Sequence, residues 1–140
     1  MTTAIDTNVL IAFWDRDDTL NSLAQFALDA SQARGPLVIS APVYAELLAL
    51  PLRTEAFLDS FCRETGIRIE WEMNETVWRA AGRAFESYAV RRKKQREAGP
   101  RRILADFLIG AHALRNGYRL LTLDDRLYRA AFPRLSIVAI

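Results

Sequence analysis

The sequence contains a single cysteine, Cys62, and a single histidine, His112. One cysteine cannot form an internal disulfide, and these two residues cannot supply the four ligands of a Cys/His zinc cage. Mechanisms that need two imidazoles are excluded as well. The six glycines form neither a GxGxxG fingerprint nor a GxxxxGK[ST] loop, and no GxSxG elbow is present. Any chemistry of this chain is therefore expected to come from carboxylates.

Long apolar runs are also missing. The longest candidates are interrupted by Glu46, Asp106 and prolines, so none is expected to span a bilayer. The first residues do not combine a charged segment, an apolar run and a small-residue cleavage site, which predicts no signal peptide. Together with the lone cysteine, this pattern predicts a soluble protein of the reducing cytoplasm.

The composition is that of a globular protein. The chain has 140 residues, of which 51% are hydrophobic and 26% charged, and this predicts one domain over residues 1–140. Its formal net charge of +2 does not by itself mark a nucleic-acid binder.

Short apolar segments alternate with helical patterns along the chain. The predicted strands end near residues 5, 40, 71, 123 and 140, and amphipathic or apolar helices fill the intervals. The resulting order, β-α-α-β-α-α-β-α-α-β-α-β, predicts an α/β fold. We expect a mainly parallel central sheet of about five strands with helices on both faces.

Four acidic residues lie among apolar neighbours. Asp6 and Asp124 follow predicted strands, whereas Glu46 and Asp106 lie in or near the first turns of apolar helices. Right-handed crossovers bring such positions to one edge of the sheet. Two like charges about 4 Å apart cost about 4 kcal/mol at an effective dielectric constant near 20. A hard divalent cation such as Mg²⁺ or Mn²⁺ would offset this cost.

Two of these acids also have a purely structural interpretation. Asp6 alone is as well explained as a helix N-cap, and Asp106 could pair with Arg102, four residues earlier. Capping alone, however, would leave too many buried carboxylates without partners. We therefore assign Asp6 to the metal and leave Thr7 or Asn8 to begin the following helix.

Four short motifs follow one another in a characteristic order, and together they cover essentially the whole chain. They resemble the spaced acids of PIN-domain ribonucleases, and most closely those of VapC toxins from type II toxin–antitoxin (VapBC) pairs. The motifs are Asp6-Thr7-Asn8 after the first strand, Glu46 in Tyr44-Ala45-Glu46-Leu47, Asp106 within residues 105–113, and Thr122-Leu123-Asp124.

The resemblance implies an endoribonuclease that uses one or two Mg²⁺ or Mn²⁺ ions to activate the water that cleaves an RNA phosphodiester. Asp6 and Asp106 would be the principal metal ligands. The implied catalytic acids are Asp6, Glu46, Asp106 and Asp124.

Three further residues match supporting positions. By the same resemblance, Asn8 and Thr122 would orient the metal ligands. Asp125 could share or replace the role of Asp124, although we prefer it as the N-cap of the following helix.

The resemblance also implies partners: a VapB-like antitoxin that inserts a segment over the active site, and a second copy of this chain in a homodimer. Two other functions are left open, a non-toxin PIN nuclease of RNA processing and a non-catalytic RNA- or protein-binding domain. A phospho-acceptor domain is disfavoured because the late strands offer no lysine.

Residues 91–102 form the one strongly basic stretch of the chain. Its cations Arg91, Arg92, Lys93 and Lys94 are expected either to be a solvated helix end or to contact RNA phosphates.

Overall fold

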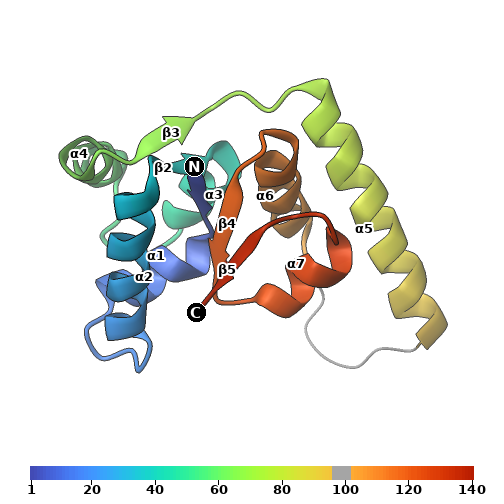
Figure 1. Ribbon diagram of the computed structural model, residues 1–140, viewed down its shortest axis with the longest axis horizontal. Coiled ribbons are helices and arrows are strands. Elements are labelled where there is room, and N and C mark those ends of the chain that lie inside the picture. The colour runs from blue at the N-terminus through green and yellow to red at the C-terminus, as the bar shows by residue number, and fades with distance from the viewer. Residues whose placement is uncertain (96–101) are drawn as a thin grey trace.

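The computed structural model describes residues 1–95 and 102–140 (Figure 1). Its strands and helices follow one another in the predicted order, which confirms the α/β alternation. The elements are β1 (Thr3–Ile5), α1 (Thr7–Trp14), α2 (Asn21–Arg34), β2 (Leu37–Ser40), α3 (Ala41–Leu47), α4 (Glu55–Thr65), β3 (Arg68–Glu70), α5 (Glu75–Gln95), α6 (Leu104–Arg115), β4 (Arg119–Thr122), α7 (Asp125–Ala131) and β5 (Ile137–Ala139).

The strands of the described residues form one sheet in the order β3-β2-β1-β4-β5, and every neighbouring pair is parallel. Thr3 of the central strand pairs with Leu37 on one side and Arg119 on the other. All residues of β1, β2 and β4 are buried, as expected for parallel strands covered on both faces. The predicted mainly parallel sheet of about five strands is confirmed.

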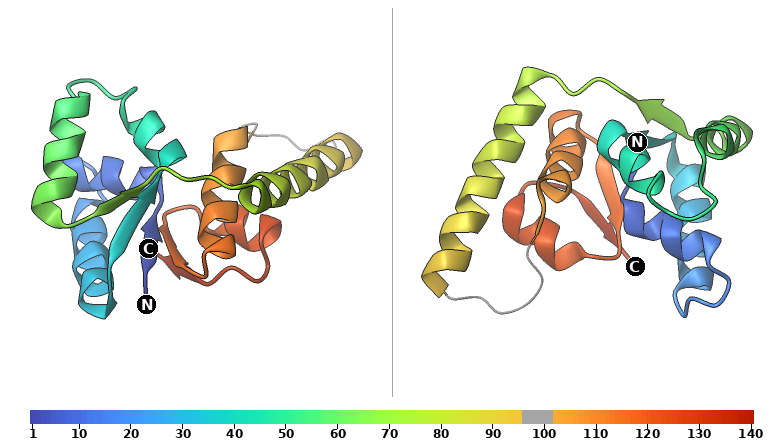
Figure 2. Two further views of the ribbon diagram at one scale, coloured as in Figure 1. Left: turned by 90° about the horizontal axis from the view of Figure 1, so that it is seen from above. Right: turned by 180° about the vertical axis from the view of Figure 1, so that it is seen from behind.

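Helices cover both faces of the sheet. Seen from above, α1, α2 and α4 lie on one side of the strands and α5, α6 and α7 on the other (Figure 2). The chain passes from β1 towards β2 but from β4 towards β5, so the strand order reverses between the neighbouring strands β1 and β4. In open α/β sheets, a crevice forms at the carboxyl ends of the strands at such a reversal.

Local signals fix several helix ends. Asn74 caps α5, because its side-chain oxygen accepts a hydrogen bond from the amide of Val77. Gly66 ends α4 with a φ of 76°, a left-handed conformation that favours glycine. Both ends are set by residues at the helix terminus itself.

A buried polar network fastens the edge strand β3 to the rest of the fold. His112 of α6 is 1% exposed, and its Nε2 lies 2.9 Å from Oε1 of Glu70. The Tyr118 hydroxyl donates to the other oxygen of Glu70 at 2.8 Å. Burial lowers the pKa of His112, although Glu70 opposes this shift, so the ring is neutral and donates through Nε2. His112 is therefore a structural residue.

Helices α6 and α7 approach each other closely at Gly110. A Cβ atom at this position would lie 2.4 Å from Cε2 of Phe132 and 3.0 Å from Cδ1 of Tyr128. Only glycine allows this contact, because no larger side chain fits between the two helices. Cys62 is buried. None of the helices described is long and apolar enough to cross a membrane.

Candidate functional site

Asp6 lies at the reversal point of the sheet, between β1 and α1, and is 5% exposed. Its Oδ1 accepts a hydrogen bond from the amide of Thr7 at 2.8 Å, and its Oδ2 accepts one from the hydroxyl of Thr122 at 2.8 Å. Asp6 is therefore itself the N-cap of α1. Thr7 is the first residue of α1, as expected, but the capping oxygen belongs to Asp6, because its carboxylate bonds both the helix amide and the hydroxyl of Thr122 on the neighbouring strand.

Asn8 and Thr122 join the end of β4 to the start of α1. Asn8 accepts a hydrogen bond from the amide of Leu123 at 3.2 Å. The hydroxyl oxygen of Thr122, while donating to Asp6, accepts one from the amide of Asp124 at 2.9 Å. Both residues thus lie beside the predicted acids, and their supporting role stays a prediction.

Glu46 approaches the same junction from α3. Its Oε1 accepts a hydrogen bond from the hydroxyl of Thr7 at 2.6 Å. Glu46 lies in the last turn of α3, not near its first turn as expected, because the helix ends at Leu47, four residues before Pro51. Thr7 was not predicted as a site residue, yet it connects Glu46 to the helix that Asp6 caps.

Asp106 lies in the first turn of α6, as expected. Its Oδ2 accepts a hydrogen bond from the amide of Ile103, the N-cap residue, at 3.2 Å. Arg102 does not form an ion pair with Asp106. It precedes the helix, so the four-residue spacing of helical pairs does not apply, and its Nη1 donates to Oδ2 of Asp124 at 2.6 Å.

Asp124 and Asp125 have different surroundings. Asp124 pairs with Arg102, whereas Asp125 pairs with Arg129 one turn later on the surface of α7. Asp125 is the first residue of α7 and not its N-cap, so the expected capping role is wrong; the N-cap position belongs to Asp124. Of the two acids, Asp124 is the one whose charge acts on Asp106.

The acids perturb one another electrostatically. Burial raises the pKa of Asp6 from 3.8 to about 6; hydrogen bonds from Thr122 and Thr7 oppose this rise, and the charge of Asp106 adds to it. Burial likewise raises the pKa of Asp106, and the charge of Asp124 adds to that rise. Raised carboxylate pKa values in a crevice are typical of functional sites, because binding of a proton or a cation stabilises such acids.

Tyr128 was missed by the sequence analysis. It is 1% exposed, and its hydroxyl has no hydrogen-bond partner within the described part of the chain. Burial raises its pKa, and the negative charges of Asp6 and Asp106 raise it further. The only available signal was its position four residues after Asp124, and a tyrosine in an apolar helix is ordinarily interpreted as core.

The donor set suits a hard cation, although no complete cage is formed. Within residues 1–95 and 102–140, no three His, Cys, Asp or Glu side chains are grouped closely enough to hold one ion. Mg²⁺, however, is commonly bound by one or two carboxylates and several waters. Asp6 and Asp106 are two carboxylates whose charges act on each other, since the charge of Asp106 raises the pKa of Asp6. Oδ1 of Asp6 accepts a hydrogen bond from the Thr7 amide, and Oδ2 accepts one from the Thr122 hydroxyl.

The basic end of α5 is connected to the site indirectly. Arg92 Nη1 donates to the hydroxyl oxygen of Tyr88 at 3.3 Å, and the same oxygen accepts from the amide of Arg102 at 2.8 Å. Arg102 in turn pairs with Asp124. Arg91 is half-buried and Lys93 and Lys94 are exposed. Residues 96–101 of the predicted basic stretch lie outside the described residues.

The chain is thus an α/β domain with a buried aspartate at the strand reversal and further acids around it. The family model of the PIN domain matches residues 3–133. The chain therefore belongs to the PIN domain family, and the resemblance found in the sequence is confirmed.

Solved structures show the same fold. VapBC2 from Rickettsia felis, solved bound to a promoter DNA fragment, aligns with a TM-score of 0.66 and 16% identity over 99% of this chain and 98% of its own. VapBC-1 from Haemophilus influenzae aligns with a TM-score of 0.63 and 21% identity over 99% of this chain and 98% of its own.

A third similar structure is Mycobacterium tuberculosis VapC20, a toxin that cleaves the sarcin–ricin loop. It aligns with a TM-score of 0.54 and 20% identity over 84% of this chain and 85% of its own. At these identities the likeness establishes the fold. A comparison with curated protein sequences gives no match.

Proposed function

We propose that this protein is a divalent-metal-dependent endoribonuclease. The observation that carries the proposal is Asp6, a carboxylate 5% exposed at the strand reversal, whose pKa burial raises to about 6 beside the charge of Asp106. Membership of the PIN domain family supports the proposal. A buried acid cluster of this kind costs stability, and binding of a cation to it recovers that cost.

The residues of the proposed site have separate roles in metal binding and in orienting the metal ligands. Asp6 and Asp106 would hold Mg²⁺ or Mn²⁺, which when bound would supply charge for the scissile phosphate and activate a water. Thr122 fixes the orientation of Asp6 from β4, and the Thr7 amide fixes it from α1. Asn8 keeps those two elements in register by accepting from the amide of Leu123.

Two further acids complete the proposed catalytic set. Glu46, held by the Thr7 hydroxyl, and Asp124, paired with Arg102, would add negative charge at the rim of the site. Each has one carboxylate oxygen without a hydrogen-bond partner among the described residues, so each would have an oxygen free to accept a hydrogen bond from water.

We propose that the nuclease is the toxin of a toxin–antitoxin pair, located in the cytoplasm and covered by a VapB-like antitoxin. Support comes from the structural neighbours, several of which are VapBC complexes. A homodimer is also proposed. Exposed apolar side chains on α5 and at the start of α6, including Trp78, Val90 and Ile103, offer surface for an interface.

One observation favours a second candidate, a non-catalytic binding domain. No three acids of the described residues form a closed metal site, and Asp124 is already neutralised by Arg102. A non-toxin nuclease of RNA processing would share the chemistry of the lead proposal and differ in its partners.

Cleavage of labelled RNA by wild type, Asp6→Asn and Asp106→Asn tests the proposal. We expect cleavage in Mg²⁺ or Mn²⁺, none in EDTA, and a loss of about 100-fold or more in both variants, because several kcal/mol of charge stabilisation depend on the metal. Asp29→Asn, an exposed acid of α2, is the matched control. Activity that persists in EDTA would contradict the proposal, and far-UV circular dichroism checks that the variants fold.

A further inference from the structure

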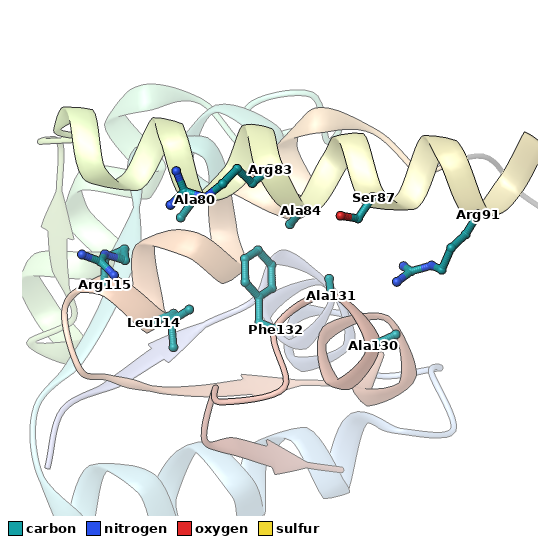
Figure 3. A pocket seen from close by; sticks show the side chains of 10 residues that line it. All are labelled: Ala80, Arg83, Ala84, Ser87, Arg91, Leu114, Arg115, Ala130, Ala131 and Phe132. Atoms are coloured by element: carbon teal, nitrogen blue, oxygen red, sulfur yellow. The ribbon is translucent and has the colours of Figure 1, made fainter.

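A groove of about 350 Å³ lies between α5 and the paired helices α6 and α7 (Figure 3). Arg83, Ser87 and Arg91 line it from α5, and Arg115 lines it from the last residue of α6. Figure 3 shows Arg115 and Arg91 at opposite ends, with Phe132 between them. The groove is distinct from the acid site, since none of the four predicted acids lines it.

The charges of this groove are unbalanced. Within residues 1–95 and 102–140, its lining includes no Asp or Glu, and Arg83, Arg91 and Arg115 form no ion pair. Two neighbouring arginines behave differently. Arg79 of α5 pairs with Glu75 at 2.8 Å, and Arg129 of α7 pairs with Asp125 at 3.1 Å. Thus the arginines inside the groove have no carboxylate partner among residues 1–95 and 102–140, whereas Arg79 and Arg129 beside it have one each.

The cations are spread along the groove. Arg83, Ser87 and Arg91 are four residues apart and share one face of α5, so the backbone positions of the two arginines are about 12 Å apart. Arg115 stands on the opposite wall. A row of cations on both walls, with a hydroxyl between two of them, suits an extended polyanion better than one small anion.

The apolar lining distinguishes between kinds of polyanion. It consists mostly of alanines, and the largest ring, Phe132, is 4% exposed. A protein partner usually needs a pocket for a large apolar anchor, which this lining does not offer. The residues that line the groove include no exposed aromatic ring for base stacking either. What remains is guanidinium contact with backbone phosphates, the sequence-independent part of nucleic-acid binding.

We propose that this groove binds the backbone phosphates of single-stranded RNA next to the cleavage site; the proposal rests on the proposed nuclease function. The geometry links the two sites through shared helices. Helix α6 carries Asp106 in its first turn and Arg115 at its last residue, which are about 14 Å apart along the helix axis. Helix α7 begins beside Asp124 and contributes Ala131 to the groove.

The test compares RNA binding by wild type, the double variant Arg83→Gln/Arg115→Gln and the matched control Arg79→Gln/Arg129→Gln. The control removes the same charge from the same region of the surface, but from arginines that are already paired. The probe is a fluorescein-labelled single-stranded RNA of about 16 nucleotides, and binding is followed by anisotropy in EDTA at several salt concentrations. For single strands, each phosphate contact contributes about 0.7 to the slope of log K against log salt.

We expect the groove variant to lower the magnitude of that slope by about 1.4, and the control to leave it within error of wild type. A slope equal to that of wild type, or an equal fall in both variants, would overturn the proposal. Polyglutamate is the competitor probe. If the groove variant weakens the binding of polyglutamate but not of RNA, the groove binds an acidic polypeptide, and the proposal that it binds RNA is wrong.

The readout separates this proposal from the nuclease proposal, because EDTA removes the metal that cleavage requires. If wild type cleaves RNA in Mg²⁺ but the groove variant keeps its salt slope, the groove proposal fails and the nuclease stands. If the slope falls as expected but wild type cleaves no RNA, the nuclease proposal fails and the groove stands as a phosphate site.

Discussion

Asp6 is held in its ionised form at a cost to the fold. A rise of its pKa from 3.8 to about 6 corresponds to about 3 kcal/mol, since each pH unit is worth about 1.4 kcal/mol. For an acid whose pKa is higher in the folded state, the folded protein holds the proton more tightly. Its unfavourable contribution is absent below pH 4, grows between about pH 4 and pH 6, and is complete above pH 6.

Replacement of Asp6 by Asn should therefore stabilise the metal-free protein while it abolishes cleavage. In EDTA at pH 7.5, we expect the free energy of unfolding of Asp6→Asn to exceed that of wild type by up to about 3 kcal/mol. The difference should disappear as the pH approaches 4. Urea denaturation at both pH values measures it.

The exposed control Asp29→Asn should show no such pH-dependent difference. A destabilised Asp6→Asn protein at pH 7.5 would mean that the hydrogen bonds from Thr7 and Thr122 outweigh burial, contrary to the raised pKa of Asp6.

At the residue scale, the sequence predicted where Asp6 lies but not how it is bound. A polar residue between a buried strand and an apolar helix must lie near a strand end, and local pattern suffices for that. The hydrogen bond from Thr122 spans 116 positions of the chain and depends on the β1–β4 pairing. Tyr128 was not predicted as a site residue for a related reason, because its sequence neighbours do not show which groups its hydroxyl faces.

At the scale of elements, β3 depends on side-chain bonds, since it is an edge strand of three residues. Glu70 accepts hydrogen bonds from Tyr118, Arg68 and His112. Burial alone would raise the pKa of Glu70, but these bonds outweigh it and lower the pKa below its ordinary 4.5. Its stabilising contribution is present above pH 4.5 and is lost as the pH falls through its folded-state pKa.

Glu70→Gln should destabilise the protein by about 1–3 kcal/mol at pH 7, because an amide cannot satisfy all three donors of a partly buried carboxylate. The difference should narrow below pH 4.5, where wild type also loses the charge. Thermal unfolding at the two pH values measures both effects.

The exposed neighbour Glu72 supplies the control, and Glu72→Gln should leave the melting temperature nearly unchanged. Equal effects of the two substitutions would show that the network does not hold β3.

The order of the elements was predictable from apolar periodicity and turn residues, whereas ends set by tertiary contacts were not. Gly66 and Asn74 mark helix ends by local chemistry alone. Arg102 illustrates the opposite case. Its spacing suggested a pair with Asp106, but α6 begins after it, and the guanidinium turns to Asp124.

At the scale of the whole molecule, metal binding and folding should be coupled. An ion that binds only the folded state stabilises it by about 2.7 kcal/mol when its concentration is 100 times its dissociation constant. We expect Mg²⁺ or Mn²⁺ to raise the melting temperature of wild type relative to EDTA, and to have little effect on Asp6→Asn. Differential scanning calorimetry across an ion titration measures this.

The same titration with NaCl at equal ionic strength separates site binding from general screening. If wild type and Asp6→Asn respond equally to Mg²⁺, the acid site does not bind the ion, and the non-catalytic candidate gains support.

The contact at Gly110 has a consequence for how this protein can vary. Because the rings of Phe132 and Tyr128 fill the space beside Gly110, a larger residue there would displace these rings and, with them, the end of α7. That one displacement would move Tyr128 relative to the acids and Ala131 relative to the arginine groove. A substitution that shifts α7 would therefore alter the proposed metal site and the proposed phosphate groove together.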